Sequence, residues 1–295
     1  MRILILGATG MLGHKLLQQL GRRMDVWGAV RGDGRILKQL EIVEPERIIS
    51  SIEADDERSL RSAIEICRPD VVVNAVGIVK QLPASADVIT TLNLNSILPH
   101  RLAQLGEEYG FRLITISTDC VFTGKEGIYT EDDPPDARDL YGLSKFLGEV
   151  NSPGALTIRT SIIGPEIGSG HGLLEWFLSN RGGRVKGLPH AIFSGFPTIV
   201  FADIIERLIT GHPGLSGIYH VSSEPISKLD LLHLFNEYYA AGVEIEPDDS
   251  VTIDRSLDSG RFRAEVGFVS DDWRTMVRRM ADDATPYKRW IEKTN

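Results

Sequence analysis

The sequence predicts an α/β fold, in which a doubly wound parallel sheet is joined to a smaller, discontinuous C-terminal domain. Short apolar runs of strand length alternate with segments of helix length up to about residue 160. Such alternation is typical of a parallel sheet covered by helices on both faces. After residue 160 the pattern loosens into loops rich in glycine and proline, which indicates a second domain.

The individual elements follow from hydrophobic periodicity. Strands are expected at 2–6, 25–30, 47–52, 71–75, 111–117 and 155–160, and helices near 11–21, 56–67, 95–109 and 139–150. A helix over 201–210 and a strand over 217–222 are expected to return to the main sheet. The first domain is therefore predicted to comprise 1–160 and about 196–222, and the second about 161–195 and 223–295.

The C-terminal run 271–293 is expected to be an amphipathic helical region that covers the second domain. Its large apolar residues are interpreted as core rather than site. They are Trp273, Met276, Val277, Met280 and Trp290.

A glycine loop follows the first strand directly. Three glycines at 7, 10 and 13 allow a tight turn, close approach of the backbone to a pyrophosphate, and close packing of helix on strand. The helix that follows would face the phosphates with unpaired N–H groups and a favourable dipole. This arrangement predicts a Rossmann-type dinucleotide site whose loop residues are Gly7, Thr9, Gly10, Met11, Leu12 and Gly13.

Tyr141 and Lys145 form a second signal, which indicates proton transfer. Positions i and i+4 lie on one face of a helix, so the ammonium can sit beside the phenol. A free tyrosine has a pKa of about 10, and a nearby cation favours its phenolate. Thr118 follows the expected strand 111–117, at the carboxyl end where open α/β sheets bind ligands.

The end of the second strand indicates which nicotinamide cofactor is bound. NAD-binding versions of the fold carry an acidic residue there for the ribose diol. This chain carries Arg31, with Arg35 close behind, and a guanidinium can pair bidentately with a 2′-phosphate. NADP(H) is therefore predicted, while Asp33 leaves NAD(H) open.

The composition excludes several classes of function. A net charge of −9 argues against general binding to nucleic acid or anionic membrane. The two cysteines, Cys67 and Cys120, are interpreted as reduced thiols of a cytoplasmic protein, and the seven scattered histidines indicate no metal site. No signal peptide or membrane span is expected, because the apolar run 3–6 is short and leads into the glycine loop.

Five segments together resemble one enzyme family. They are 7–13 with Gly-x-x-Gly-x-x-Gly spacing, 74–77, 117–122, 141–145 with Gly148 and Glu149 after it, and 159–161. Their order and spacing resemble the extended short-chain dehydrogenase/reductases along nearly the whole chain. The resemblance is strongest to the branch of dTDP-4-dehydrorhamnose reductase and related nucleotide-sugar reductases.

The resemblance implies hydride transfer from NADP(H) to a carbonyl carbon of a nucleotide-linked keto sugar, with Tyr141 as proton donor. It implies that Lys145 holds the nicotinamide ribose and that Thr118 hydrogen-bonds the substrate oxygen. Asn95 would have a supporting role near the cofactor. Further cofactor contacts are implied at Glu53, Ala54, Asn74, Ala75, Val76 and Gly77, and substrate contacts at Asp119, Ser161 and Arg255. A homodimer stays open.

Some positions depart from the branch and leave the sugar open. Cys120 replaces a tyrosine, and Ile192-Phe193 replaces the usual Asp-Gln. Family dehydratases place Asp-Glu after the threonine, whereas this chain has Asp119-Cys120, which argues against dehydration. Two alternatives remain: a nucleotide-sugar epimerase of the same fold, or a non-catalytic NADP-binding subunit like the regulatory subunit of methionine adenosyltransferase.

Overall fold

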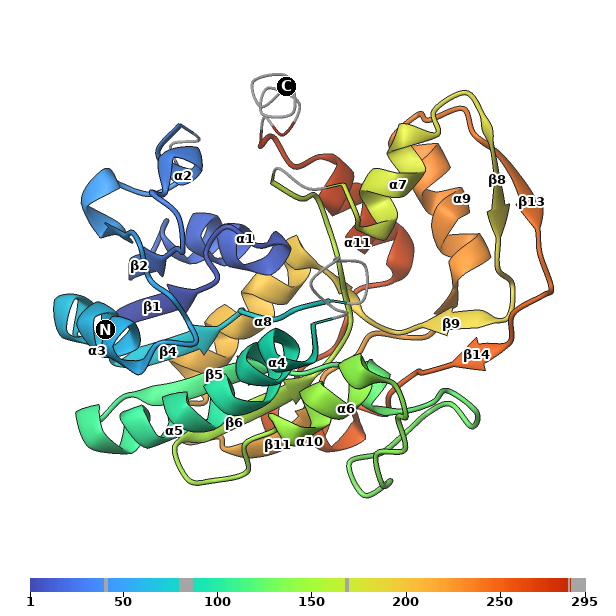
Figure 1. The fold of residues 1–295 in the computed structure, drawn as a ribbon. Coiled ribbons are helices and arrows are strands. Elements are labelled where there is room, and N and C mark those ends of the chain that lie inside the picture. The colour runs from blue at the N-terminus through green and yellow to red at the C-terminus, as the bar shows by residue number, and fades with distance from the viewer. Residues whose placement is uncertain (40–41, 80–86, 168–169, 286, 288–295) are drawn as a thin grey trace. The chain divides into compact units, whose positions relative to one another are not determined.

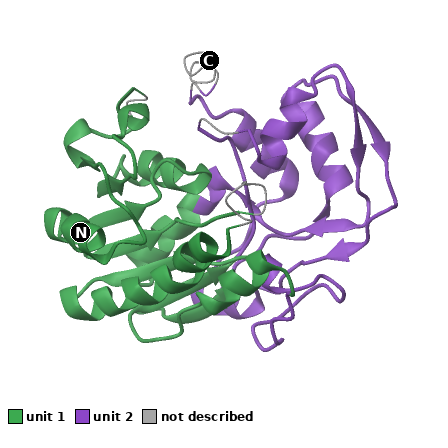
Figure 2. Cartoon of the chain, viewed as in Figure 1, with its two compact units in different colours: residues 1–118, 138–159, 202–219 green, residues 119–137, 160–201, 220–295 purple. Residues whose placement is uncertain are grey.

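The computed structural model describes residues 1–39, 42–79, 87–167, 170–285 and 287. The chain divides into two compact units (Figure 2). The first comprises Met1–Thr118, Arg138–Arg159 and Ala202–Tyr219, and the second comprises Asp119–Ala137, Thr160–Phe201 and His220–Asn295. The sequence boundaries assigned residues 119–137, 160, 196–201 and 220–222 to the first domain, whereas these residues lie in the second unit.

A seven-stranded sheet forms the centre of the first unit, in the order β11-β6-β5-β4-β1-β2-β3 (Figure 1). The ladders from β3 to β6 are parallel, which confirms the predicted α/β fold. Chain order reverses between β1 and β4, and ligands bind at such a switch point. The strands are β1 (Arg2–Leu6), β2 (Asp25–Ala29), β3 (Ile48–Ile49), β4 (Val71–Asn74), β5 (Arg112–Ile116), β6 (Ala155–Arg159) and β11 (Gly217–His220).

The helices of this unit and of its connections are α1 (Met11–Leu20), α2 (Arg35–Gln39), η1 (Pro45–Arg47), α3 (Glu57–Cys67), α4 (Val88–Leu92), the π-helical turn η3 (Asn93–Ile97), α5 (Leu98–Tyr109), α6 (Leu140–Leu147) and α8 (Thr198–Gly211), the last of which begins in the second unit. The expected helix 95–109 is therefore the last part of a longer helical run, which begins with α4 at Val88 and continues through η3 into α5. The expected strand 47–52 is reduced to the two residues of β3.

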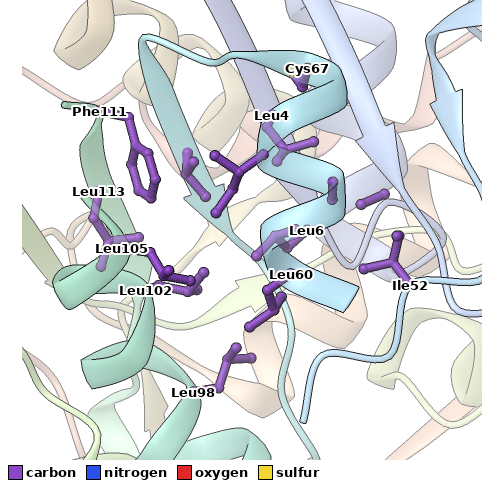
Figure 3. Packing of buried hydrophobic residues seen from close by; sticks show 14 of the residues in the cluster. Leu4, Leu6, Ile52, Leu60, Cys67, Leu98, Leu102, Leu105, Phe111 and Leu113 are labelled. Carbon is purple, nitrogen blue, oxygen red and sulfur yellow. The ribbon is translucent and has the colours of Figure 1, made fainter. Parts of the chain in front are cut away.

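Helices cover both faces of the sheet. On one face, leucines of α3 and α5 pack on alternate strand residues such as Leu4, Leu6 and Leu113 (Figure 3). On the other face, a Cβ at Gly28 would lie 2.9 Å from Leu17 of α1, so β2 and α1 are in close contact there. Arg112 binds α8 and the turn after it, because Nη1 donates to the Leu208 carbonyl at 2.8 Å and Nη2 donates to the Leu215 carbonyl at 2.9 Å.

The second unit contains three small sheets, with orders β10-β7, β12-β9-β14 and β13-β8. Its C-terminal helix α11 buries Trp273, Met276, Val277 and Met280, which confirms their expected core role, while Trp290 lies outside the described residues. The remaining elements are η4 (Asp119–Val121), β7 (Ile162–Ile163), α7 (Leu173–Ser179), β8 (Arg184–Gly187), β9 (Ala191–Phe193), β10 (Phe196–Pro197), β12 (Ile226–Ser227), α9 (Lys228–Tyr238), β13 (Glu244–Pro247), β14 (Ile253–Asp254), α10 (Gly260–Val266) and α11 (Trp273–Ala281).

Candidate active site

Most of the predicted site residues follow neighbouring strands of the first unit. Reading the sheet from β3 to β5, Glu53, Arg31 and Gly7 follow β3, β2 and β1, Asn74 is the last residue of β4, and Thr118 follows β5. Because these strands are parallel, their carboxyl ends meet at one edge of the sheet. The structure therefore gathers residues that are far apart in sequence along a single edge.

The glycine loop has the tight turn and the close packing of helix on strand that its glycines predict. Gly7 has a φ of +77°, and a Cβ on it would lie 2.9 Å from the Ala75 carbonyl. A Cβ on Gly13 would lie 2.1 Å from the Gly7 oxygen, so helix and strand could not pack as they do. Gly10 is exposed and begins α1 without a side-chain cap. Backbone N–H groups at an uncapped helix start are suited to a pyrophosphate.

The neighbours of this loop have separate roles. Leu12 is buried, so it packs in the core, whereas Thr9 and Met11 are half-buried. Across the switch point, the Asn74 side chain accepts from the Val76 N–H at 3.1 Å and donates to Thr115 Oγ1 at 3.1 Å. Asn74 thereby holds the short segment of Ala75, Val76 and Gly77 beside the glycine loop.

Asn95 joins the segment after β4 to helix α6. Its Oδ1 accepts from the Ile78 N–H at 2.9 Å, and its Nδ2 donates to the Ile78 carbonyl at 3.0 Å and to Ser144 Oγ at 3.1 Å. Ser144 Oγ in turn donates to the Tyr141 carbonyl at 2.9 Å. Asn95 lies in the π-helical turn η3, and such turns are frequent at functional sites.

Helix α6 carries Tyr141 and Lys145, and Asp139 caps its start by accepting from the Gly142 N–H at 3.0 Å. Lys145 Nζ donates to the Ile116 carbonyl at the end of β5, at 2.7 Å, and lies 3.9 Å from a Cβ built on Gly77. Thr118, two residues beyond Ile116, is buried. The structure thus brings Lys145 to the strand end that leads into Thr118.

Burial changes the electrostatics of Lys145. Its residue is 8 % exposed, and this burial lowers its pKa to about 8, against an opposing attraction from Glu149. An ammonium that gives up its proton near neutrality is typical of sites that perform acid–base chemistry. Tyr141, one helical turn before Lys145 on α6, is half-buried.

The residues predicted for the adenosine end lie on neighbouring segments. Arg31 is exposed just after β2. The Val30 N–H donates a hydrogen bond to the Ile49 carbonyl at 2.9 Å, and the Val30 carbonyl accepts one from the Ile52 N–H at 2.9 Å. These bonds place Arg31 near the segment of Glu53 and Ala54. Glu53 is exposed, and its N–H donates to Ser59 Oγ at 2.9 Å. The Arg35 backbone N–H and guanidinium lower the pKa of Asp33, whose carboxylate is paired with Arg35 at 2.5 Å.

The three predicted substrate residues lie in the second unit. The Asp119 N–H donates to the Thr160 carbonyl at 3.2 Å, next to Ser161. Arg255 Nε donates to the Phe122 carbonyl at 2.8 Å, so the arginine is held on the same short segment that begins with Asp119. Their role in substrate binding stays a prediction.

Two contributors were missed by the sequence analysis. Ser144 links Asn95 to α6, and Glu149 forms a buried ion pair described below. Glu149 was noted only as part of a motif, although a carboxylate four residues after Lys145 was a signal that could have indicated its importance.

Two kinds of site have no counterpart in the part of the chain that the structure describes. No group of three or more histidine, cysteine, aspartate or glutamate side chains there could hold a metal ion. Likewise, no helix among those residues has the length and apolar character needed to cross a membrane.

The sequence profile of the RmlD substrate binding domain family matches residues 1–285. This chain belongs to that family. The chain is similar to a probable dTDP-4,6-dihydroxy-2-methyloxan-3-one 4-ketoreductase of Streptomyces antibioticus. The two are 30% identical over 231 residues, which cover 76% of this chain and 72% of the relative.

Two further comparisons bear on this RmlD-family chain. Methionine adenosyltransferase 2 subunit beta of Danio rerio is 31% identical over 171 residues, 56% of this chain and 49% of the relative. The crystal structure of a hypothetical dTDP-4-dehydrorhamnose reductase from Sulfolobus tokodaii has a TM-score of 0.76 at 27% identity, over 92% of this chain and 98% of that one. The chain is therefore similar both to proteins named as reductases and to a protein named as a subunit.

Proposed function

We propose that this chain is an NADP(H)-dependent reductase of a nucleotide-linked keto sugar. The observation that carries the proposal is the position of Lys145. Its buried ammonium is bonded to the end of β5 and lies beside Gly77, so one group is placed to serve both the phenol of Tyr141 and a cofactor. The relative from Streptomyces antibioticus, which is named as a ketoreductase, supports the same reaction class.

The residues of the first unit then have distinct roles. Bound NADP(H) would supply the hydride for the keto carbon. Tyr141 donates its phenolic proton to the oxygen of that carbonyl, which becomes the hydroxyl of the product. Lys145 stabilises the phenolate that remains, and the Thr118 hydroxyl orients the substrate oxygen. In the second unit, Asp119, Ser161 and Arg255 are proposed to contact the nucleotide sugar.

The preference for NADP(H) rests on Arg31. Its exposed guanidinium is available to a 2′-phosphate, whereas the nearby carboxylate of Asp33 is occupied by Arg35. An occupied carboxylate is a weaker acceptor for the ribose diol of NAD(H). NAD(H) is therefore proposed as the poorer cofactor.

A homodimer and a cytoplasmic location are also part of the proposal. The elements α4, η3 and α6 pack against one another, and several of their large apolar residues are exposed. They are Val88, Ile89, Ile97, Leu143, Phe146 and Leu147. An apolar patch of this kind is suited to a second copy of the chain. Replacing both Leu143 and Leu147 by lysine should convert a dimer to a monomer in sedimentation velocity.

The decisive experiment follows NADPH and NADH oxidation across dTDP-, UDP- and GDP-linked keto sugars, with Tyr141→Phe as the matched variant. The substitution removes only the phenolic oxygen. We expect turnover on at least one sugar, with NADPH preferred, and a loss of roughly a hundredfold or more in Tyr141→Phe.

Other outcomes would favour the alternatives. Interconversion of two nucleotide sugars without net cofactor oxidation would indicate an epimerase. Tight NADPH binding with no turnover, together with co-purification of a partner enzyme, would indicate a regulatory subunit, as the name of the relative from Danio rerio suggests for that protein.

A further inference from the structure

A buried carboxylate lies immediately after the catalytic helix. Glu149 follows α6, and its side chain is 2 % exposed. It is bound by Arg159 of β6, whose side chain is 4 % exposed, through Nε at 2.8 Å and Nη2 at 2.8 Å. The roles proposed for Tyr141, Lys145 and Thr118 do not involve this ion pair.

The same carboxylate also contacts the end of β5. Ser117 Oγ donates to Glu149 Oε1 at 2.8 Å, and Ser117 directly precedes Thr118. The carbonyl of Ile116, the residue before Ser117, accepts the hydrogen bond from Lys145 Nζ at 2.7 Å. Two consecutive residues at this strand end are therefore hydrogen-bonded to two side chains four residues apart, Lys145 within α6 and Glu149 just beyond its end. This arrangement fixes the register between β5 and α6.

Stability alone does not account for such a cluster. Well-packed apolar residues replace buried ion pairs at little cost or even with a gain in stability. A satisfied ionic cluster does supply fixed hydrogen-bond directions, because the Arg159 fork and the Ser117 hydroxyl each require one orientation of the carboxylate.

The cluster also bears on the charge of Lys145. Glu149 attracts the Lys145 ammonium and opposes the effect of its burial. Tyr141 is the titratable neighbour on the same helix, and Arg159 is the charged partner of Glu149 on β6. Two groups of other elements that lie near Lys145, the Ile116 carbonyl and Gly77, carry no charge.

We propose that Glu149 is a positioning residue for the reduction, whose carboxylate fixes the peptide joining Ser117 and Thr118 and places a negative charge at the strand end that also binds the Lys145 ammonium. This inference rests on the proposed function. Glu149 acts through Ser117 and Lys145 and does not itself touch the reacting atoms.

The first test removes one contact and leaves the ion pair intact. Ser117→Ala should lower kcat about tenfold with the KM for NADPH within about twofold, because a small displacement of an orienting group slows the chemical step. Ser117→Thr, which keeps the hydroxyl, should restore most of kcat. Ser223→Ala is the matched control, since Ser223, like Ser117, is a buried serine whose hydroxyl donates a hydrogen bond, in this case to the Gly195 carbonyl at 2.7 Å. An equal fall in the control, or no fall in Ser117→Ala, would overturn the proposal.

The second test does not depend on turnover. In protein with ¹³C-labelled lysine, the Lys145 signal is assigned by its absence in Lys145→Arg and followed against pH. In Glu149→Gln its titration midpoint should move down by roughly one pH unit, since an attracting charge has been removed. An unchanged midpoint would refute the electrostatic role. If the unaltered protein reduces no keto sugar, the proposed function fails while this measurement still decides the effect of Glu149 on Lys145.

Discussion

Lys145 couples the stability of the protein to pH. Burial lowers its pKa to about 8 in the folded chain from an ordinary 10.5. Below pH 8 both states bind the proton, so the folded state bears the full cost of burying the charge. Between pH 8 and 10.5 the folded state loses the proton first, so the unfolded state binds more protons and stability rises with pH.

This sign leads to a measurable difference between two proteins. From pH 8 to 10.5, the free energy of unfolding should rise by roughly 3 kcal/mol more in the unaltered chain than in Lys145→Met, which has no charge to bury. Urea unfolding at several pH values checks this. Parallel curves for the two proteins would mean that Lys145 is not buried as described.

The two cysteines should differ sharply in reactivity. Cys67 is fully buried, and burial raises the pKa of its thiol to about 12, whereas Cys120 is half-buried. Because the thiolate is the reactive form, a thiol reagent at pH 8 should modify at most one cysteine of the native protein quickly and both after denaturation. Cys120→Ser should remove the fast phase, and rapid modification of Cys67 would contradict the described core.

The sequence could predict residue types where spacing alone determines the geometry. Tyr141 and Lys145 share a helix face because they are four residues apart, and the glycines are required by backbone contacts within a short loop. The bond between Ser117 and Glu149 spans 32 residues and depends on how β5 and α6 pack. No local pattern encodes such a contact.

Among the elements, the turn from β1 to α1 separates folding from binding. A Cβ on Gly13 would collide with the Gly7 carbonyl at 2.1 Å, whereas a Cβ on Gly10 meets only the Gly7 oxygen at 3.2 Å. Gly13→Ala should therefore destabilise the chain by about 1–3 kcal/mol. Gly10→Ala should leave stability within about 1 kcal/mol and weaken NADPH binding, since it places a methyl at the exposed helix start.

Thermal unfolding and fluorescence titration with NADPH distinguish the two variants. Gly214→Ala serves as a control, because a Cβ there meets nothing within 4 Å. If Gly10→Ala bound NADPH as tightly as the unaltered chain, the pyrophosphate would not lie at this turn.

Element boundaries were predicted best where strands are fully buried. The five residues of β6 are all buried, and the strand ends one residue before the expected run 155–160, whereas the strand expected over 47–52 ends at Ile49. Ser51, two residues later, has a φ of +61°, which lies outside the strand conformation. The short elements of the second unit, such as β8 and β13, depend on pairing between residues about 60 apart and leave little trace in local periodicity.

At the scale of the whole molecule, cofactor binding should raise the free energy of global unfolding. A ligand at a hundred times its Kd adds about 2.7 kcal/mol. We expect NADPH to raise the melting temperature more than NADH at equal concentration. Because Arg31 is exposed, Arg31→Ala should melt like the unaltered chain without cofactor, yet lose the difference between the two cofactors. Equal effects of NADPH and NADH on the unaltered chain would contradict the proposed role of Arg31.

The position of β11 in the chain has a consequence for biosynthesis. This strand, Gly217–His220, lies beside β6, Ala155–Arg159, and completes the sheet. A ribosome adds about 5–20 residues per second, so the outer edge of β6 stays unpaired for roughly several seconds before β11 has been synthesised. Unpaired strand edges recruit other chains. The nascent protein is therefore most vulnerable to aggregation during translation of the segment between these two strands, when an apolar strand edge is already present and its partner is not.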